Sequence, residues 1–166
     1  LPALSRVAYA EIASGSQFSW GVRFDGANAL GVEIFPIGVE TLDDFAPFFK
    51  AARQGGAEAA LIPDFPRLNP RLKRIGMEAS QHGMPAIGYR RDFAEGGGLL
   101  SYGPLLSEST LRLALQIDKI LRGAHPGDLP VERQTRFEFV INLREAKALG
   151  VSIPRLVRLR ADELIQ

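Results

Sequence analysis

The sequence predicts an α/β domain in which an open parallel sheet is flanked by helices. Short runs of β-branched and aliphatic residues alternate along the 166-residue chain with longer segments of helical period, which is the pattern of strands joined by crossover helices. The strand-like runs are almost continuously apolar, as expected for a sheet that is covered on both faces. Hydrophobic residues make up 46% of the chain, which is enough to build the core of one domain.

Five or six strands are expected, four of them in the first ninety residues. The predicted strands are Val7 to Ala10, Val32 to Val39, Ala59 to Pro63, Pro85 to Tyr89, Leu99 to Tyr102 and Phe137 to Asn142. The residues expected in the core of the sheet are Val7, Ala8, Ile34, Leu61, Ile62, Ala86 and Ile87.

Polar residues and glycines mark the ends of the helices expected between these strands. Thr41 is placed to cap the second helix, and Asn142 with Glu145 three positions later resembles a capping box. Gly83 and Gly123 stand where a left-handed residue ends a helix. The predicted helices are Gln17 to Leu30, Leu42 to Gln54, Asn69 to Gly83, Glu108 to Arg122, a short helix ending at Gly150, and a last one that begins at Ser152 and Pro154.

Two segments are predicted to be irregular. The stretch Ala124 to Thr135 is rich in proline and glycine and is expected to be a connecting loop. Gly96 to Gly98 leads into a strand and not into a helix, so we interpret it as a flexible turn and not as a phosphate-binding loop.

The composition excludes several classes of partner. Twenty basic and nineteen acidic side chains give a net charge of +1, which is too balanced to attract nucleic acid by charge alone. There is no cysteine, so thiolate chemistry and disulfides are excluded. The longest apolar runs are far shorter than the roughly twenty residues needed to span a bilayer. Leu1 is followed almost at once by a strand, without an initiator methionine or signal sequence, so we expect a piece of a larger protein.

No pattern of catalytic or metal-binding residues is present. Neither of the two histidines has a partner at metal-ligand spacing, and His82 is expected to bind free carbonyls in the last turn of a helix. Ser14 to Ser16 follows the first strand and could hold an anion, but it lacks the glycine fingerprint and the lysine of phosphate loops. No nucleophile motif is recognisable. We therefore expect no catalysis, no metal and no cofactor.

Candidate ligand-binding residues follow the predicted strands. In an open parallel sheet, ligands bind at the carboxyl ends of the strands. The residues assigned to a site there are Ser14, Asp64, Tyr89, Arg91 and Tyr102. Together they offer a hydroxyl, an acid, two aromatic rings and a guanidinium. The alternatives remain open: Arg91 could pair with Asp92 on the surface, Asp64 could cap a turn, and Tyr102 could be an ordinary packing residue.

An ordered series of short segments resembles a known family. The segments are PAIGYRRDF (85–93), GGGLLSYGP (96–104), LQIDKILRG (115–123), DLPVE (128–132), FEFVINL (137–143) and AKALG (146–150). The series resembles the carboxyl half of a bacterial family of ABC transporter substrate-binding proteins, whose studied members include binders of aromatic amino acids. Arg91, Asp92 and Phe93 fill the family's Arg-acidic-aromatic turn.

The resemblance implies one lobe of a type I periplasmic-binding-protein fold, in which two lobes close on a ligand about a hinge. Residues 1–104 would form the second lobe. Residues 105–166 would hold a crossover helix, a linker, a strand and terminal helices that partly belong to the first lobe. The sequence departs from the family at Glu11 to Gly15, where many relatives have an Asn-Pro turn, and at Leu105, where many are polar.

The resemblance also implies a function. It is that of a periplasmic or extracytoplasmic component of an ABC uptake transporter, which binds a small molecule such as an aromatic amino acid or related acid and delivers it to a membrane permease. A ligand-sensing module of a signalling protein with the same fold is the alternative, and a small α/β enzyme is a second rival. The helix bearing Leu111, Leu115 and Ile117 is expected to expose apolar surface and to make this chain self-associate.

Overall fold

The computed structural model describes residues 4–12, 20–64, 66 and 68–166, and in these ranges seven strands form a single mixed sheet in the order β2-β1-β3-β4-β5-β6-β7. The strands are β1 (Arg6–Ile12), β2 (Glu33–Val39), β3 (Ala59–Leu61), β4 (Ala86–Gly88), β5 (Leu100–Pro104), β6 (Phe137–Asn142) and β7 (Glu163–Ile165). The helices are α1 (Trp20–Ala29), α2 (Phe45–Gln54), α3 (Leu72–Gln81), α4 (Arg91–Glu95), α5 (Leu106–Leu121), α6 (Leu143–Ala148) and α7 (Arg155–Arg158). Short 3₁₀ turns are η1 (Leu42–Asp44), η2 (Asn69–Arg71) and η3 (Pro126–Asp128).

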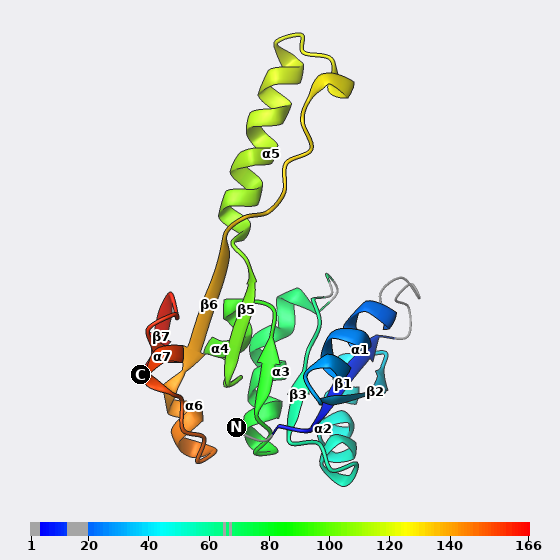
Figure 1. The fold of residues 1–166 in the computed structure, drawn as a ribbon, viewed down its shortest axis with the longest axis vertical. Coiled ribbons are helices and arrows are strands. Elements are labelled where there is room, and N and C mark those ends of the chain that lie inside the picture. Colours follow the sequence, from blue (N-terminus) through cyan, green and yellow to red (C-terminus); the bar gives the residue numbers. More distant parts are fainter. Residues whose placement is uncertain (1–3, 13–19, 65, 67) are drawn as a thin grey trace.

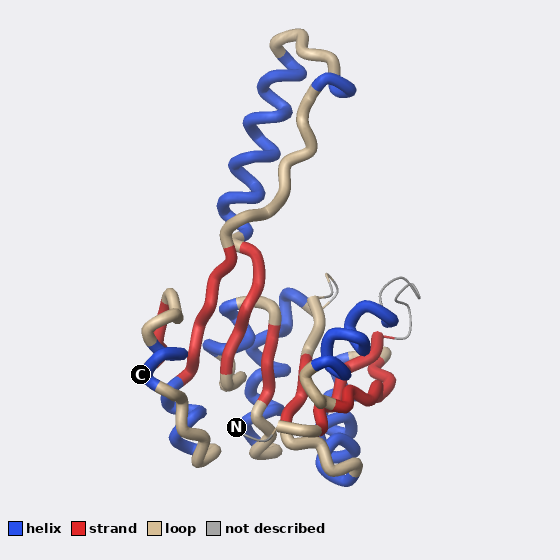
Figure 2. The backbone as a smooth tube through the Cα atoms, in the orientation of Figure 1, coloured by secondary structure: helices blue, strands red, loops and turns tan. Residues whose placement is uncertain are grey.

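The predicted α/β fold is confirmed, and the predicted open parallel sheet is mostly parallel, with two corrections. All neighbouring strands run parallel except β5 and β6, which pair antiparallel. The chain leaves the sheet after β5 and returns directly beside it (Figures 1 and 2), so β6 runs opposite to β5, whereas a crossover connection would have made the two strands parallel. The seventh strand, β7, was not predicted because its three residues are too short for a periodicity signal.

Helices α2, α3 and α4 cover one face of the sheet. Phe45, Phe48 and Phe49 of α2, Ile75 of α3 and Phe93 of α4 are fully buried and pack in one cluster with the alanines of β1, β3 and β4. The chain goes from β1 outward to β2 and then back across to β3. Because crossover connections are right-handed, this reversal places α1 on the opposite face, where it packs against β2.

The core prediction holds for one face of the sheet and fails for part of the other. Val7, Ala8, Ile62 and Ala86 are buried as predicted. Three predicted core residues are only half-buried: Ile34, Leu61 and Ile87. Ile34 lies on the edge strand β2. Leu61 and Ile87 are paired neighbours on the face opposite to α2–α4, where they line a cavity described below.

The predicted helix ends are largely confirmed. Asn142 Oδ1 accepts a hydrogen bond of 3.0 Å from the Glu145 amide, and Gly83 and Gly123 adopt φ of 58° and 101°. Thr41 is the N-cap residue of η1, which leads into α2, as predicted, and it forms a capping box with Asp44. The Asp44 carboxylate accepts hydrogen bonds from the Thr41 amide at 2.6 Å and from its hydroxyl at 3.0 Å. The last helix begins after Pro154, which is its N-cap residue.

The turn at Gly96 to Gly98 is shaped by close packing. A Cβ added at Gly96 would clash with the backbone of Lys73 in α3, and one added at Gly98 would clash with the ring of Phe93. Gly97 has φ of 121°, which side chains rarely adopt. The sequence predicts a flexible turn in this segment, and the structure shows that its glycines are required by close packing.

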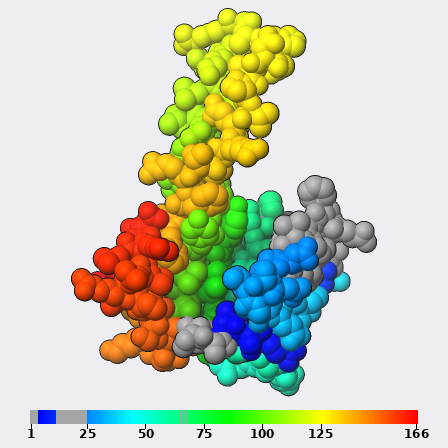
Figure 3. Space-filling view, viewed as in Figure 1, coloured from blue at the N-terminus to red at the C-terminus, as the bar shows by residue number. Residues whose placement is uncertain are grey.

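Residues 105–136, which comprise α5 and the segment that returns from it, form an arm that stands away from the sheet (Figures 1 and 3). As predicted, apolar surface is exposed on this helix: 60% of Leu111, 53% of Leu115 and 47% of Ile117 is accessible. Among the helices that the structure describes, none is long and apolar enough to cross a membrane.

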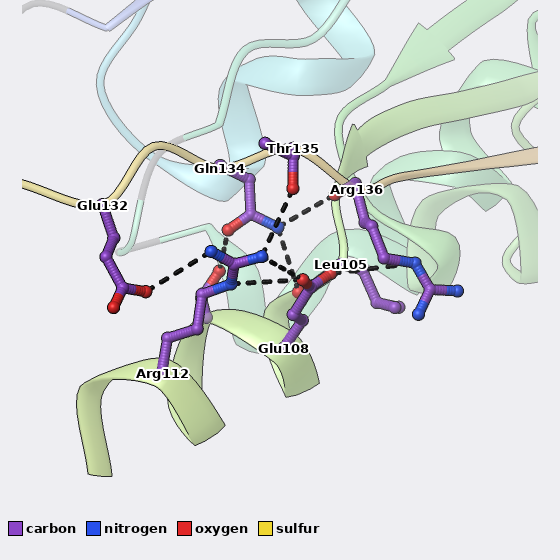
Figure 4. A network of polar contacts seen from close by, with 8 residues as sticks. Leu105, Glu108, Arg112, Glu132, Gln134, Thr135 and Arg136 are labelled. Atoms are coloured by element: carbon purple, nitrogen blue, oxygen red, sulfur yellow. Dashed lines mark hydrogen bonds and ion pairs between the residues drawn. The ribbon is translucent and has the colours of Figure 1, made fainter. Parts of the chain in front are cut away.

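A polar network fastens the base of the arm (Figure 4). Arg112 of α5 pairs with Glu108 one turn earlier at 2.6 Å and with Glu132 of the return segment at 3.3 Å. It also donates to the Thr135 hydroxyl at 3.3 Å. The Leu105 amide donates to the carbonyl of Arg136 at 3.0 Å, so the two connections to the sheet are held side by side.

Candidate ligand-binding site

The carboxyl ends of β1 and β3 border the point where the chain connections diverge to opposite sides of the sheet. Crevices at such switch points are the usual ligand sites of open α/β sheets. A cavity of about 470 Å³ lies here, and we call it the tyrosine cavity. Its described lining residues are Tyr9, Leu61, Ile62, Pro63, Asp64, Ile87, Gly88, Tyr89 and Tyr102. All three tyrosines of the chain are among them.

Strand register explains why the three tyrosines line one cavity. Tyr9 of β1 is paired with Leu61 of β3, and Leu61 is paired with Ile87 of β4, so these side chains share a face of the sheet. Tyr89 follows Ile87 by two positions, and alternation points it to the same side. Tyr9 is 5% exposed, whereas Tyr102 at the other end of the cavity is 54% exposed. The lining of the cavity thus extends from a buried ring at Tyr9 to exposed side chains at Asp64 and Tyr102.

Tyr102 is held in place by phenylalanines of β6. Its ring stacks on Phe137 with centroids 5.4 Å apart and an interplanar angle of 10°, and it meets Phe139 edge-on at 6.0 Å. These contacts follow from the antiparallel pairing, in which Tyr102 lies opposite Phe139. Packing against two rings restricts the exposed tyrosine, so a ligand would meet an ordered aromatic surface.

Asp64 is the one charged residue among the described lining residues. Burial raises the pKa of Tyr89, and the negative charge of Asp64 raises that pKa further, which places the carboxylate near the ring. No hydrogen bond or ion pair joins Asp64 to another described residue, so its expected alternative of capping a turn has no support among these contacts.

Arg91 lies outside the tyrosine cavity, beside a smaller one of about 210 Å³. Three carboxylates surround its guanidinium: Glu95 at 2.9 Å, Glu138 at 3.5 Å, and Glu163 of β7. The pKa of Arg91 is raised chiefly by the Glu163 hydrogen bond and next by that of Glu95. Arg91 thus pairs with these three carboxylates, and not with Asp92 as in the alternative interpretation, and the pairs with Glu138 and Glu163 connect α4 to β6 and β7.

The comparisons with known proteins agree with this architecture. A family model described as ABC transporter substrate binding protein matches residues 24–165. The chain belongs to this family. A search of the curated proteins gives no match.

Solved structures with the same fold are similar over 99% of this substrate-binding chain. They include a conserved domain protein from Vibrio cholerae (20% identity, TM-score 0.83) and an ABC domain from Streptococcus pneumonia in complex with L-Trp (20%, 0.85). A third is the ligand-free, open form of a substrate-binding protein with adhesive properties from Clostridium difficile (17%, 0.70). The chain spans 56%, 56% and 55% of their respective lengths.

Three of the five site residues that the sequence predicts line the tyrosine cavity of this substrate-binding chain: Asp64, Tyr89 and Tyr102. Arg91 lies beside the neighbouring cavity, and Ser14 lies outside the described residues. Sequence reasoning missed Tyr9 and Phe137. Tyr9 stands inside a predicted strand, where alternation from Ala8 places it on the face opposite to Ala8.

Other groups of the substrate-binding chain have structural roles. His82 Nδ1 lies 2.9 Å from the carbonyl oxygen of Glu78, as expected, and its ring stacks on Phe49. In the part of the chain that the structure describes, no three His, Asp or Glu side chains are grouped to hold a metal ion. A cavity of about 510 Å³ lies along the arm, between α5 and the return segment, but it is not at the ends of the strands.

Proposed function

We propose that this chain is the ligand-binding part of an extracytoplasmic ABC uptake receptor, which holds a small molecule in the tyrosine cavity and delivers it to a membrane permease. The observation that carries the proposal is the cavity at the switch point of the sheet, in a chain that belongs to the substrate-binding family. The cavity volume of about 470 Å³ lies within the roughly 300–1,000 Å³ range of small-molecule sites.

The ligand would be held between two lobes. In this proposal residues 1–104 form one lobe, to which β6 and β7 add their strands, and α5 crosses to the other. The arm supports this assignment because its helix stands away from the sheet and exposes leucines and isoleucines on several sides. The open end of the tyrosine cavity, at Tyr102, would face the opposite lobe and be covered when the lobes close.

We propose an aromatic ligand, such as an aromatic amino acid or a related acid. Tyr89 and Tyr102 offer ring faces within one cavity, and Phe137 supports Tyr102 from behind. Aromatic rings bind one another in stacked or edge-on geometry, and such pairs add about 0.5–1.5 kcal/mol beyond the buried area. The complex of the S. pneumonia domain with L-Trp is consistent with this ligand class.

A thermal-shift screen of the full-length gene product tests the proposal. A ligand that binds only the native state raises the melting temperature by mass action, so a panel of aromatic amino acids, aromatic acids, aliphatic amino acids and sugars separates the classes. We expect aromatic compounds to give the largest shifts. Tyr102→Ala should reduce those shifts, whereas Leu156→Ala, a truncation of an exposed leucine on α7, should not. Shifts produced by sugars alone would contradict the aromatic assignment.

A further inference from the structure

The described lining of the tyrosine cavity carries negative charge and no positive charge. Its described lining holds three tyrosine rings and the carboxylate of Asp64, and no basic residue. The face of a tyrosine ring carries partial negative charge and attracts cations, as in the aromatic cages that bind organic ammonium groups. Rings and carboxylate thus favour the same kind of ligand group, a positive one.

The charges around the cavity strengthen this preference. Glu11 follows Tyr9 by two positions on β1, so it lies on the same face of the sheet near the strand's end. The positive charge of Arg91 is compensated by three carboxylates. Arg90 makes no ion pair with another described residue, but it lines the smaller cavity and not the tyrosine cavity.

We propose that this lobe recognises the ammonium group of the ligand, with Asp64 as its ionic partner and the tyrosine rings enclosing it. The inference rests on the proposed function of the cavity and makes it more specific: the substrate class is aromatic primary amines, which includes aromatic amino acids bound through their amino group. A carboxylate on the same ligand would point away from Asp64, toward Arg90 or toward the opposite lobe.

Two probes with the same ring and the same spacer test the inference. Tryptamine carries an ammonium group where indole-3-propionate carries a carboxylate, so calorimetric titration of both into the full-length gene product isolates the effect of charge. We expect tryptamine to bind at least about tenfold more tightly. Asp64→Asn keeps the size of the side chain and removes its charge, and it should weaken tryptamine binding roughly tenfold to a hundredfold, as expected for a hydrogen bond to a charged group.

Matched variants separate recognition by Asp64 from a general effect of charge. Asp92→Asn removes a carboxylate beside the smaller cavity and should leave tryptamine affinity unchanged, as should Arg90→Ala. Tighter binding of indole-3-propionate, lost in Arg90→Ala, would overturn the inference while leaving an aromatic ligand in place. An unchanged affinity in Asp64→Asn would overturn it as well. Failure of both probes to bind would contradict the aromatic ligand itself, and with it the inference.

Discussion

At the scale of single residues, Arg91 is distinguished by its ion pairs. Its place after a strand predicts a ligand contact, and its guanidinium is surrounded by Glu95, Glu138 and Glu163. The side chain is 41% exposed, so solvent screens these pairs. We expect Arg91→Ala to lower the free energy of unfolding by about 1 kcal/mol and to change ligand affinity less than about twofold. Urea unfolding and calorimetry measure the two effects. A large loss of affinity without loss of stability would return Arg91 to the site.

Gly98 is a residue whose importance is steric. A Cβ at this position would overlap the ring of Phe93, which is fully buried. Overpacking a core costs roughly 1–3 kcal/mol, so we expect Gly98→Ala to destabilise the fold by that amount. Gly26→Ala is the matched control, because a Cβ there meets nothing within 4 Å and alanine is favoured in a helix by about 1 kcal/mol. Thermal unfolding of both variants should shift the melting temperature in opposite directions.

The carboxylate of Asp44 takes part in a helix cap, and its contribution to stability depends on pH. Backbone hydrogen bonds from Thr41 and Glu40 lower the pKa of its carboxyl below the ordinary value of 3.8. A lowered folded-state pKa stabilises the fold above the unfolded value and stops doing so as the pH falls through the folded pKa. We therefore expect stability to decline below about pH 4 in part because of Asp44. The decline should be smaller in Asp44→Asn, as measured by melting temperature against pH, and identical pH profiles would contradict this role.

At the scale of elements, the arm depends on the network at its base. Arg112 joins α5 to Glu132 and Thr135 of the return segment. We expect Arg112→Ala to speed amide hydrogen exchange in residues 129–135, because the segment loses its side-chain ties to the helix. Arg122→Ala breaks the ion pair between Asp118 of α5 and Arg122, the residue that follows the helix, and serves as the control. Equal exchange in the two variants would show that the network does not hold the segment.

Much of the element order could be predicted from the sequence, because capping and helix-ending residues such as Asn142, Gly83 and Gly123 act locally. What could not be predicted depends on partners distant in the chain. Register across β1, β3 and β4 decides that Tyr9, Leu61 and Ile87 line a cavity instead of a core. The aromatic support of Tyr102 depends on the antiparallel return of β6, and the compensation of Arg91 on the unpredicted strand β7.

At the scale of the whole molecule, the exposed apolar side chains of the arm predict association. Leu111, Leu115 and Ile117 are each about half exposed or more, and contiguous apolar patches drive association. We expect this 166-residue chain, expressed alone, to self-associate, and Leu115→Glu to weaken the association. Leu30→Glu changes an exposed leucine away from the arm and should have no effect. Light scattering that gives a monomer of 18.1 kDa at high concentration would contradict this prediction.

The proposed function depends most on one claim, that ligand binds where the sheet's connections diverge. A crystal structure of the full-length gene product with its tightest-binding aromatic compound tests that claim directly. We predict a ligand ring against Tyr89 and Tyr102 and an ammonium group within hydrogen-bonding distance of Asp64. A ligand found only elsewhere, for example in the cavity between α5 and its return segment, with the tyrosine cavity empty, would contradict it.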